Sequence, residues 1–263
     1  MKFWLVVPAA GTGVRFGSSL PKQYSPLLGS TVIEHCLKRL LGIPSEAIIV
    51  ALHSEDIAWH GLDIFDNERI RPVSGGRQRG ESVLKALNAI SAEADDEDWV
   101  LVHDVVRPCI TQADLNGLIA GVADSPVGGL LATPVNATLK RIVLSTKALP
   151  SIDRPEKSVH TGGGDGIRVE GVICETIDRE GLWLAATPQM FRYRVLITAI
   201  NHCLERGITI TDEAAAVERL GHQPLIIRGR SDNIKITLAE DLLLAEAILN
   251  AQKCTDSKQG VER

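Results

Sequence analysis

Aromatic residues are scarce in this chain, since Phe, Trp and Tyr make up 4% of its 263 residues. An excess of positive charge is missing too, because 28 Lys and Arg stand against 33 Asp and Glu, a formal charge of −5. A nucleic-acid groove needs both stacking rings and basic side chains. We therefore expect no nucleic-acid partner, and any anionic ligand must be bound by a few well-placed cations.

Paired cysteines are also lacking. The five cysteines are widely spaced and never form a C-x-x-C pair, which argues against a zinc site or a disulfide framework and favours a reducing, cytoplasmic location. Long apolar runs are missing as well, because Pro8 cuts the run Phe3–Val7 far short of a membrane span or a signal peptide. We expect no membrane segment.

What the chain does have is the balance of a folded protein, with 44% hydrophobic and 23% charged residues, which excludes disorder as its dominant state. Short apolar, β-branched runs alternate with segments of helical period. The predicted strands of the first half are Phe3–Val7, Ala47–Leu52, Arg69–Val73, Trp99–Val102 and Gly128–Val135, and the predicted helices are Thr31–Leu41 and Glu81–Ile90. This pattern predicts an α/β fold, a Rossmann-like, mostly parallel sheet covered by helices on both faces.

Residues 137–177 interrupt the alternation. Two predicted strands, Thr138–Leu144 and Ile167–Ile177, are joined by a glycine-containing connection without helical period, which indicates a protruding β-arm. The elements predicted after the arm are helices near Phe191–Glu205, from Thr211 and from about Ala239, and strands at Pro224–Ile227 and Asn233–Thr237. We expect a single domain over 1–254, with the arm as an insertion, and a disordered tail over 255–263.

A glycine-rich loop follows the first predicted strand. It runs from Pro8 to Gly17, and Pro21-Lys22-Gln23 comes soon after it. Small residues let backbone N–H groups approach a phosphate, and Arg15 and Lys22 add positive charge. The glycine spacing fits neither the dinucleotide-binding pattern nor the P-loop, whereas a long loop with two cations suits a triphosphate. Alone, the glycines would equally fit an ordinary turn.

Six motifs occur in the order found in one enzyme family. They are Pro8-Ala-Ala-Gly-x-Gly-x-Arg15 with Pro21-Lys22-Gln23-Tyr24, Gly75-Gly76-x-x-Arg79-x-x-Ser82, His103-Asp104-x-x-Arg107-Pro108, the stretch from Leu182-Trp183 to Gln189, Thr211-Asp212-Glu213, and the stretch from Asp232 to Thr237. Together they resemble the 2-C-methyl-D-erythritol 4-phosphate cytidylyltransferases over nearly the whole chain outside the arm tip and the tail. The resemblance implies transfer of CMP from CTP to a sugar-alcohol phosphate, release of pyrophosphate and a requirement for Mg²⁺.

The resemblance also implies which residues form the site. Arg15, Lys22 and Lys235 are the expected catalytic cations, with the two lysines flanking the α-phosphate. The residues expected to contact the nucleotide are Ala9, Ala10, Gly11, Thr12, Gly13, Gly75, Gly76 and Ser82. Those expected to contact the acceptor are Asp104, Arg107, Thr138, Arg179, Thr187 and Thr211. In the family the arm reaches across to a partner subunit and carries an arginine, here Arg179, into its site, which implies a homodimer.

Several of these residues also have plainer interpretations. Asp104 follows the predicted strand Trp99–Val102 and could hold Mg²⁺ or the acceptor's hydroxyl groups, since both need a hard oxygen ligand, or it could simply brace a loop. Lys235 lies in a predicted apolar strand, either on a solvated face or at the active centre. His103 is expected to be structural. Thr211–Glu213 also has the pattern of an ordinary helix N-terminus.

The expected reaction suits this set of residues. A phosphate monoester has its second ionisation near pH ~6, so the attacking oxygen is already anionic at neutral pH and needs no general base. The reaction instead needs Lys, Arg and a metal in fixed positions to bring two anions together. The sequence offers cations after its strands and no convincing nucleophilic triad, which is the pattern that this mechanism predicts.

Two departures from the family pattern and three alternative functions stay open. Ala137 stands where an Asp is expected before the acceptor threonine, and the arm is longer than usual. The alternatives are a ribitol 5-phosphate cytidylyltransferase, a non-catalytic nucleotide-binding module and an NAD-binding dehydrogenase. Pro8-Ala9-Ala10 and Leu182-Trp183 favour methylerythritol phosphate as the acceptor. Retention of the charged site residues argues against a binding module, and the glycine spacing argues against a dehydrogenase.

Overall fold

The computed structural model describes residues 2–11, 20–143 and 171–259, with the backbone alone for 255–259. The chain divides into two compact units, one formed by Met1–Thr133 with Ala185–Arg263 and the other by Pro134–Leu184. The smaller unit encloses the predicted arm, 137–177. Among the described residues, no helix is long and apolar enough to cross a membrane.

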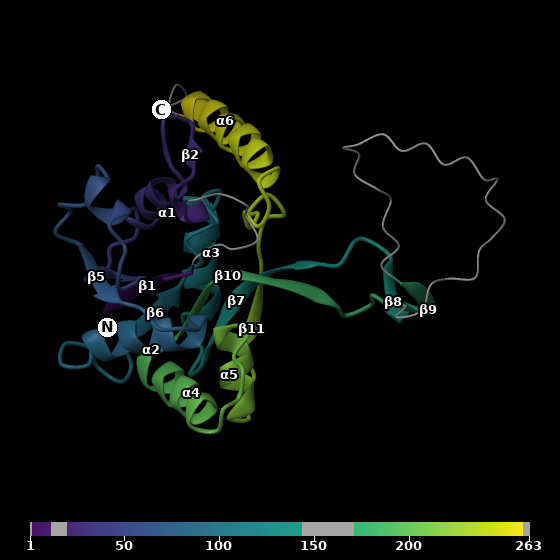
Figure 1. Cartoon of the computed structure of the whole chain (residues 1–263). Helices are drawn as coiled ribbons and strands as arrows, with labels where there is room; N and C mark the ends of the chain where they lie inside the picture. Colours follow the sequence, from purple (N-terminus) through teal and green to yellow (C-terminus); the bar gives the residue numbers. More distant parts are fainter. Residues whose placement is uncertain (1, 12–19, 144–170, 260–263) are drawn as a thin grey trace, which may run out of the picture. The chain divides into compact units, whose positions relative to one another are not determined.

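A seven-stranded sheet is the centre of the larger unit (Figure 1). Strand β1 pairs in parallel with β4 and β6, β4 with β5, and β11 with β7, whereas β10 runs antiparallel to β6. The predicted, mostly parallel sheet is therefore confirmed. In sheet order the strands are β11 (Leu225–Arg228), β7 (Gly128–Pro134), β10 (Trp183–Arg192), β6 (Trp99–Val102), β1 (Phe3–Ala9), β4 (Ala47–Leu52) and β5 (Ile70–Ser74).

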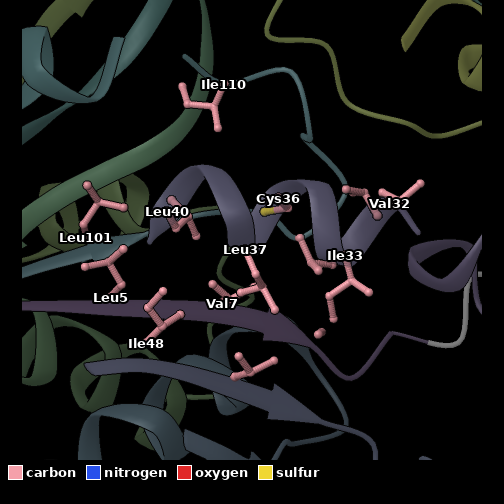
Figure 2. Close-up of a cluster of buried hydrophobic side chains, with 14 of the residues drawn as sticks. Leu5, Val7, Val32, Ile33, Cys36, Leu37, Leu40, Ile48, Leu101 and Ile110 are labelled. Carbon is pink, nitrogen blue, oxygen red and sulfur yellow. The ribbon is translucent and has the colours of Figure 1, made fainter. Parts of the chain in front are cut away.

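Helices cover both faces of this sheet. Because successive side chains of a strand point to opposite faces, each strand contributes to two buried clusters. Leu5 and Val7 of β1 belong to the same buried cluster as residues of α1 (Val32–Leu40) and α3 (Gln112–Val122). Figure 2 shows Leu37 of α1 directed at this face of the sheet. Their neighbours in β1, Trp4 and Val6, join a second cluster with α2 (Arg79–Ala89), α4 (Tyr193–Glu205) and α5 (Glu213–Arg219).

Helix α1 illustrates how the local sequence sets these elements. The hydroxyl of Thr31 accepts a hydrogen bond from the backbone N–H of Glu34, and the Glu34 carboxylate accepts one from the backbone N–H of Thr31. This capping box satisfies donors that the helix itself leaves unpaired. Helix α3 begins with the same arrangement of Thr111 and Asp114, although α3 was not among the predicted helices.

Four short elements connect the larger ones. Residues Lys22–Tyr24 and Ala58–Gly61 form 3-10 turns. Strands β2 (Pro26–Leu27) and β3 (Ser30–Thr31) form a small antiparallel pair before α1. The turn at Lys22 follows the glycine-rich loop, of which residues 12–19 lie outside the described part of the chain.

The predicted strand Asn233–Thr237 is wrong. This segment has irregular backbone, and its groups bond outside any ladder: the N–H of Ile236 donates to the carbonyl of Val106, and the side chain of Asn233 donates to the carbonyl of Thr187. Sequence reasoning also missed β10 as a strand. The last helix, α6 (Asp241–Gln259), continues past Thr255, where a disordered tail was expected.

The smaller unit contains the two strands expected for the arm. Strand β8 (Leu139–Val143) pairs antiparallel with β9 (Val172–Ile177), with an irregularity between Arg141 and Ile142. The connection between them, residues 144–170, lies outside the described residues. The strand prediction for the arm is therefore confirmed in its described part.

Candidate active site

Residues that follow the carboxyl ends of the strands surround a cavity of about 230 Å³ in the larger unit. Ala9–Gly11 continue from β1, Asp104 follows β6, and Gly76–Arg79 lead into α2. Lys22 and Lys235 complete the lining, although they lie more than two hundred residues apart in the chain. This edge of a parallel sheet is the usual place for ligands.

Two further cavities adjoin the first and share residues with it. One, of about 830 Å³, extends from Ala10 and Gly11 across Gly75 and Gly76. The other, of about 150 Å³, shares Arg79, Asp104 and Lys235 with the first cavity. The residues predicted for the acceptor that line this smallest cavity are Asp104, Arg107, Thr187 and Thr211. The structure thus brings the predicted nucleotide residues and these acceptor residues to neighbouring cavities with a common wall.

The Gly75-Gly76 turn leaves no room for larger residues. A Cβ atom on Gly75 would come within 2.5 Å of the Ala10 Cβ, and one on Gly76 within 2.3 Å of the Glu81 Cβ. The hydroxyl of Ser82 accepts a hydrogen bond from the N–H of Gly76 at 3.0 Å. Ser82 therefore braces the turn, besides lining the first cavity.

The two predicted catalytic lysines meet at one place. The ammonium of Lys22 donates to the backbone carbonyl of Ile236 at 2.8 Å, next in the chain to Lys235. Beside Lys22, the side chain of Gln23 donates to the carbonyl of Ala9 at 2.9 Å and so ties this turn to the end of β1. The bond from Lys22 to Ile236 holds the two lysines close together, and both line the same cavity.

Asp104 is the centre of a charged network. Its Oδ1 lies 3.0 Å from Nε of Arg79, and its Oδ2 lies 2.8 Å from Nζ of Lys235 and 3.8 Å from Nε of Arg107. Burial alone would raise the pKa of this carboxyl, but Arg79 and Lys235 hold the pKa well below its usual range. Asp104 is therefore ionised, and its position fixes the cations around it.

His103, next to Asp104, is a buried structural residue, as expected. Burial lowers its pKa to about 4, so the ring is neutral at physiological pH. Its Nε2 lies 3.1 Å from the carbonyl of Arg107, which can only accept, and its Nδ1 lies 3.2 Å from the Thr187 hydroxyl. Since Nε2 carries the proton, the Thr187 hydroxyl donates to Nδ1, and its oxygen accepts from the N–H of Asp104 at 3.0 Å. This chain of bonds holds the loop that carries Asp104.

Sequence reasoning missed two residues of the network, Arg79 and Glu213. Both terminal nitrogens of Arg79 contact the carboxylate of Glu213, at 2.5 and 3.0 Å, and Glu213 is completely buried. Both residues belong to the motifs, and Glu213 does lie in the first turn of α5, but that position alone does not indicate its burial. The actual N-cap is Asp212, whose carboxylate accepts from the N–H of Ala215.

Other predicted residues lie outside the described site. Thr12, Gly13 and Arg15 fall in the part of the chain that the structure does not describe. Thr138 and Arg179 belong to the smaller unit, where the guanidinium of Arg179 donates to the carbonyl of Asn136. Their roles stay predictions.

The donor set does not fit a metal ion bound by the protein on its own. Among the described residues, no group of three or more His, Cys, Asp or Glu side chains could hold a metal. Both oxygens of Asp104 are already paired with cations. Asp104, the predicted metal ligand, therefore binds Arg79 and Lys235 in this structure.

Comparisons with known proteins agree on one family. The family model described as 2-C-methyl-D-erythritol 4-phosphate cytidylyltransferase matches residues 3–156 and 165–251. A protein of that name from Pseudomonas putida (strain GB-1) is 43% identical over 242 residues, covering 91% of this chain and 92% of its own. Another from Vibrio atlanticus (strain LGP32) is 41% identical over 249 residues, covering 94% and 95%.

Solved structures give the same result. The crystal structure of a 4-diphosphocytidyl-2C-methyl-D-erythritol synthase matches with a TM-score of 0.73 and 31% identity, covering 94% of this chain and 98% of its own. That of the Francisella tularensis 2-C-methyl-D-erythritol 4-phosphate cytidylyltransferase has a TM-score of 0.74 and 29% identity, covering 94% and 100%.

Proposed function

This chain belongs to the family of the 2-C-methyl-D-erythritol 4-phosphate cytidylyltransferases, and on that premise we propose which of its residues carry out the reaction. The chain is a nucleotidyltransferase of isoprenoid biosynthesis that transfers CMP from CTP to 2-C-methyl-D-erythritol 4-phosphate. Enzymes of this class generally use a divalent metal ion. The relatives do not support the alternative of a ribitol 5-phosphate cytidylyltransferase.

One observation carries the assignment of roles: the cavity at the glycine turn and the cavity with the acceptor residues share the wall formed by Arg79, Asp104 and Lys235. A nucleotide in the first cavity and a phosphate acceptor in the second would meet at this wall. The reacting α-phosphate and the attacking oxygen therefore belong there.

Lys235 in this wall and Lys22 in the first cavity provide the positive charge that the reaction needs. The acceptor phosphate is already ionised at neutral pH, so catalysis consists of holding two anions together and stabilising the additional negative charge on phosphorus. Both lysines line the cavity. Arg15 is the third catalytic cation in this proposal, on the strength of the family motif.

The nucleotide is assigned to the first two cavities. Its triphosphate lies along Ala9–Gly11, with Thr12 and Gly13 following in the same loop. Its base and ribose lie against the Gly75-Gly76 turn and Ser82. The base is assigned to the backbone of this turn, where a Cβ atom at either glycine would collide with its protein neighbours.

The acceptor is assigned to the smallest cavity. Arg107 faces the acceptor phosphate, and Thr187 and Thr211 lie beside its hydroxyl groups. Mg²⁺ would arrive with CTP as part of that substrate and would supply positive charge beside its phosphates. Asp104 therefore orients cations and acceptor in place of binding a metal alone.

The arm and the compartment complete the proposal. The enzyme is a cytoplasmic homodimer in which Thr138 and Arg179 of the arm serve the partner subunit's site. Support for the compartment comes from the cysteines, all of which are free thiols. Support for the dimer comes from the family resemblance of the arm.

Pyrophosphate release from CTP and 2-C-methyl-D-erythritol 4-phosphate tests the assignment of Lys22. Lys22→Ala removes a charge from the reacting phosphate, so we expect turnover to fall by ~10²–10³-fold with an unchanged circular dichroism spectrum. Lys38→Ala, an exposed lysine of α1, is the matched control and should keep wild-type turnover. Near-normal turnover of Lys22→Ala would refute its role.

A further inference from the structure

Glu213 is buried beneath the wall that the two substrate cavities share. Its side chain is 0% exposed, so a ligand in either cavity cannot touch it. A buried carboxylate without a partner is strongly unfavourable, and such a charge is kept only where it is paired. The question is what this charge does next to the reacting groups.

The partner of Glu213 is Arg79, and the pairing fixes the arginine. Glu213 Oε1 lies 2.5 Å from Nη1, and Oε2 lies 3.0 Å from Nη2. Two parallel bonds of this kind set the plane of a guanidinium group as well as its position. The third nitrogen, Nε, is then directed at Asp104 Oδ1, 3.0 Å away.

Asp104 passes this constraint on to Lys235. With Oδ1 held by Arg79, the second oxygen of Asp104 lies 2.8 Å from Nζ of Lys235. The Lys235 side chain is 44% exposed, and a lysine of that exposure would otherwise sample many rotamers. Within the described part of the chain, Asp104 is the one carboxylate that forms an ion pair with the Lys235 ammonium.

The charges of the network leave a net attraction for phosphate. Arg79, Arg107 and Lys235 supply three positive charges, and Asp104 supplies a negative one. Burial raises the pKa of Glu213, but its two bonds to the Arg79 guanidinium oppose that rise and favour the ionised carboxylate, the second negative charge. Burial alone would lower the pKa of Arg79, but the carboxylates of Glu213 and Asp104 raise it, so the guanidinium stays charged. Glu213 can therefore hold Arg79 without cancelling the positive charge of the wall.

We propose that Glu213 is a positioning residue for cytidylyl transfer, acting through Arg79 and Asp104 to hold the Lys235 ammonium at the boundary between the nucleotide and acceptor cavities. The inference rests on the role proposed above for Lys235. A group fixed before the reaction stabilises developing charge better than a mobile one, because it needs no reorganisation at that moment. Glu213 thus contributes to kcat without touching substrate.

The test compares Glu213→Gln with the wild-type enzyme, using pyrophosphate release from CTP and 2-C-methyl-D-erythritol 4-phosphate. We expect kcat to fall by ~10-fold or more, since small displacements of a positioned group have effects of this size, with the KM for CTP nearly unchanged. Arg79→Lys and Glu213→Asp, which keep the charges but lose the paired geometry, should show the same split. They also replace Glu213→Gln if that variant does not fold.

A double-mutant comparison separates positioning from general stability. In a Lys235→Ala background Glu213→Gln should have little further effect on kcat, whereas in a Ser82→Ala background it should keep its full effect. Glu34→Gln, which changes another buried carboxylate, controls for lost stability and should leave kcat unaltered. Equal losses in both backgrounds, or an unchanged kcat in folded Glu213→Gln, would overturn the proposal. Normal activity of Lys235→Ala alone would overturn both the relay and the role of Lys235.

Discussion

At the scale of single residues, the site depends on a network of ion pairs that fix one another's positions. Asp104 contacts Arg79, Arg107 and Lys235 within 4 Å, and Glu213 in turn fixes Arg79. The chain as a whole is slightly acidic, with a formal charge of −5, so attraction for a triphosphate comes from the local arrangement of a few cations. Net charge is the wrong scale on which to judge this chemistry.

His103 predicts a specific dependence of stability on pH. Burial lowers its pKa from the ordinary 6.5 to about 4 in the folded chain. Between these values the unfolded chain binds a proton that the folded chain does not, so the free energy of unfolding falls as the pH drops from 6.5 to about 4. Above pH 6.5 this contribution is fully present.

Urea unfolding at several pH values measures this effect against His103→Gln, which cannot titrate. Across the window, wild type should lose up to about 3 kcal/mol more than the variant. Asp104 titrates in both proteins and does not affect the difference. Parallel curves for the two proteins would contradict the assignment of a buried neutral histidine.

At the scale of secondary-structure elements, the helix termini are set by local side chains. Thr111 caps α3 by accepting a hydrogen bond from the N–H of Asp114 at 3.1 Å. Thr111→Ala should lower the free energy of unfolding by about 1 kcal/mol and leave turnover per folded molecule unchanged, because no residue of α3 lines the three cavities. Asn116→Ala, at an exposed position of the same helix, should change stability far less. Equal effects of the two changes would show that the cap is unimportant.

Strong periodicity made most elements predictable from the sequence, whereas tertiary contacts decided the rest. The run Ala47–Leu52 became β4 with the predicted bounds because it is buried along its whole length. The apolar run Asn233–Thr237 suggested a strand, but its backbone and side chains bond to loops at Val106 and Thr187. No local sequence pattern predicts hydrogen bonds to such distant loop residues.

The site was predictable to a similar degree. The order of the motifs predicted that Lys22, Asp104 and Lys235 belong to one site, and in the structure all three line one cavity. Glu213 was missed because a glutamate in the first turn of a helix has a sufficient local explanation in the helix dipole. That its side chain is buried against Arg79 follows only from the packing of α5 in the fold.

At the scale of the whole molecule, the proposal that the arm serves a partner subunit predicts complementation between two inactive variants. Lys22→Ala removes the proposed catalytic charge, and Arg179→Ala removes the proposed acceptor contact of the arm. In a mixed dimer, one site would combine an intact Lys22 with an intact Arg179 from the other chain. Coexpression should therefore restore roughly a quarter of wild-type activity for a random mixture of symmetric dimers.

Each variant expressed alone is the control for this experiment. Size measurement must show dimers in both preparations. If Arg179 acts on its own subunit, mixed dimers contain no complete site and coexpression restores nothing. That outcome would contradict the shared site.

The most direct test of the central claim is the acceptor preference of the wild-type enzyme. Purified protein with CTP and Mg²⁺ is supplied with 2-C-methyl-D-erythritol 4-phosphate or with ribitol 5-phosphate, and kcat/KM is obtained from pyrophosphate release. The family membership and the site predict that methylerythritol phosphate is preferred by orders of magnitude. A preference for ribitol 5-phosphate, or no pyrophosphate with methylerythritol phosphate from folded protein, would contradict the account.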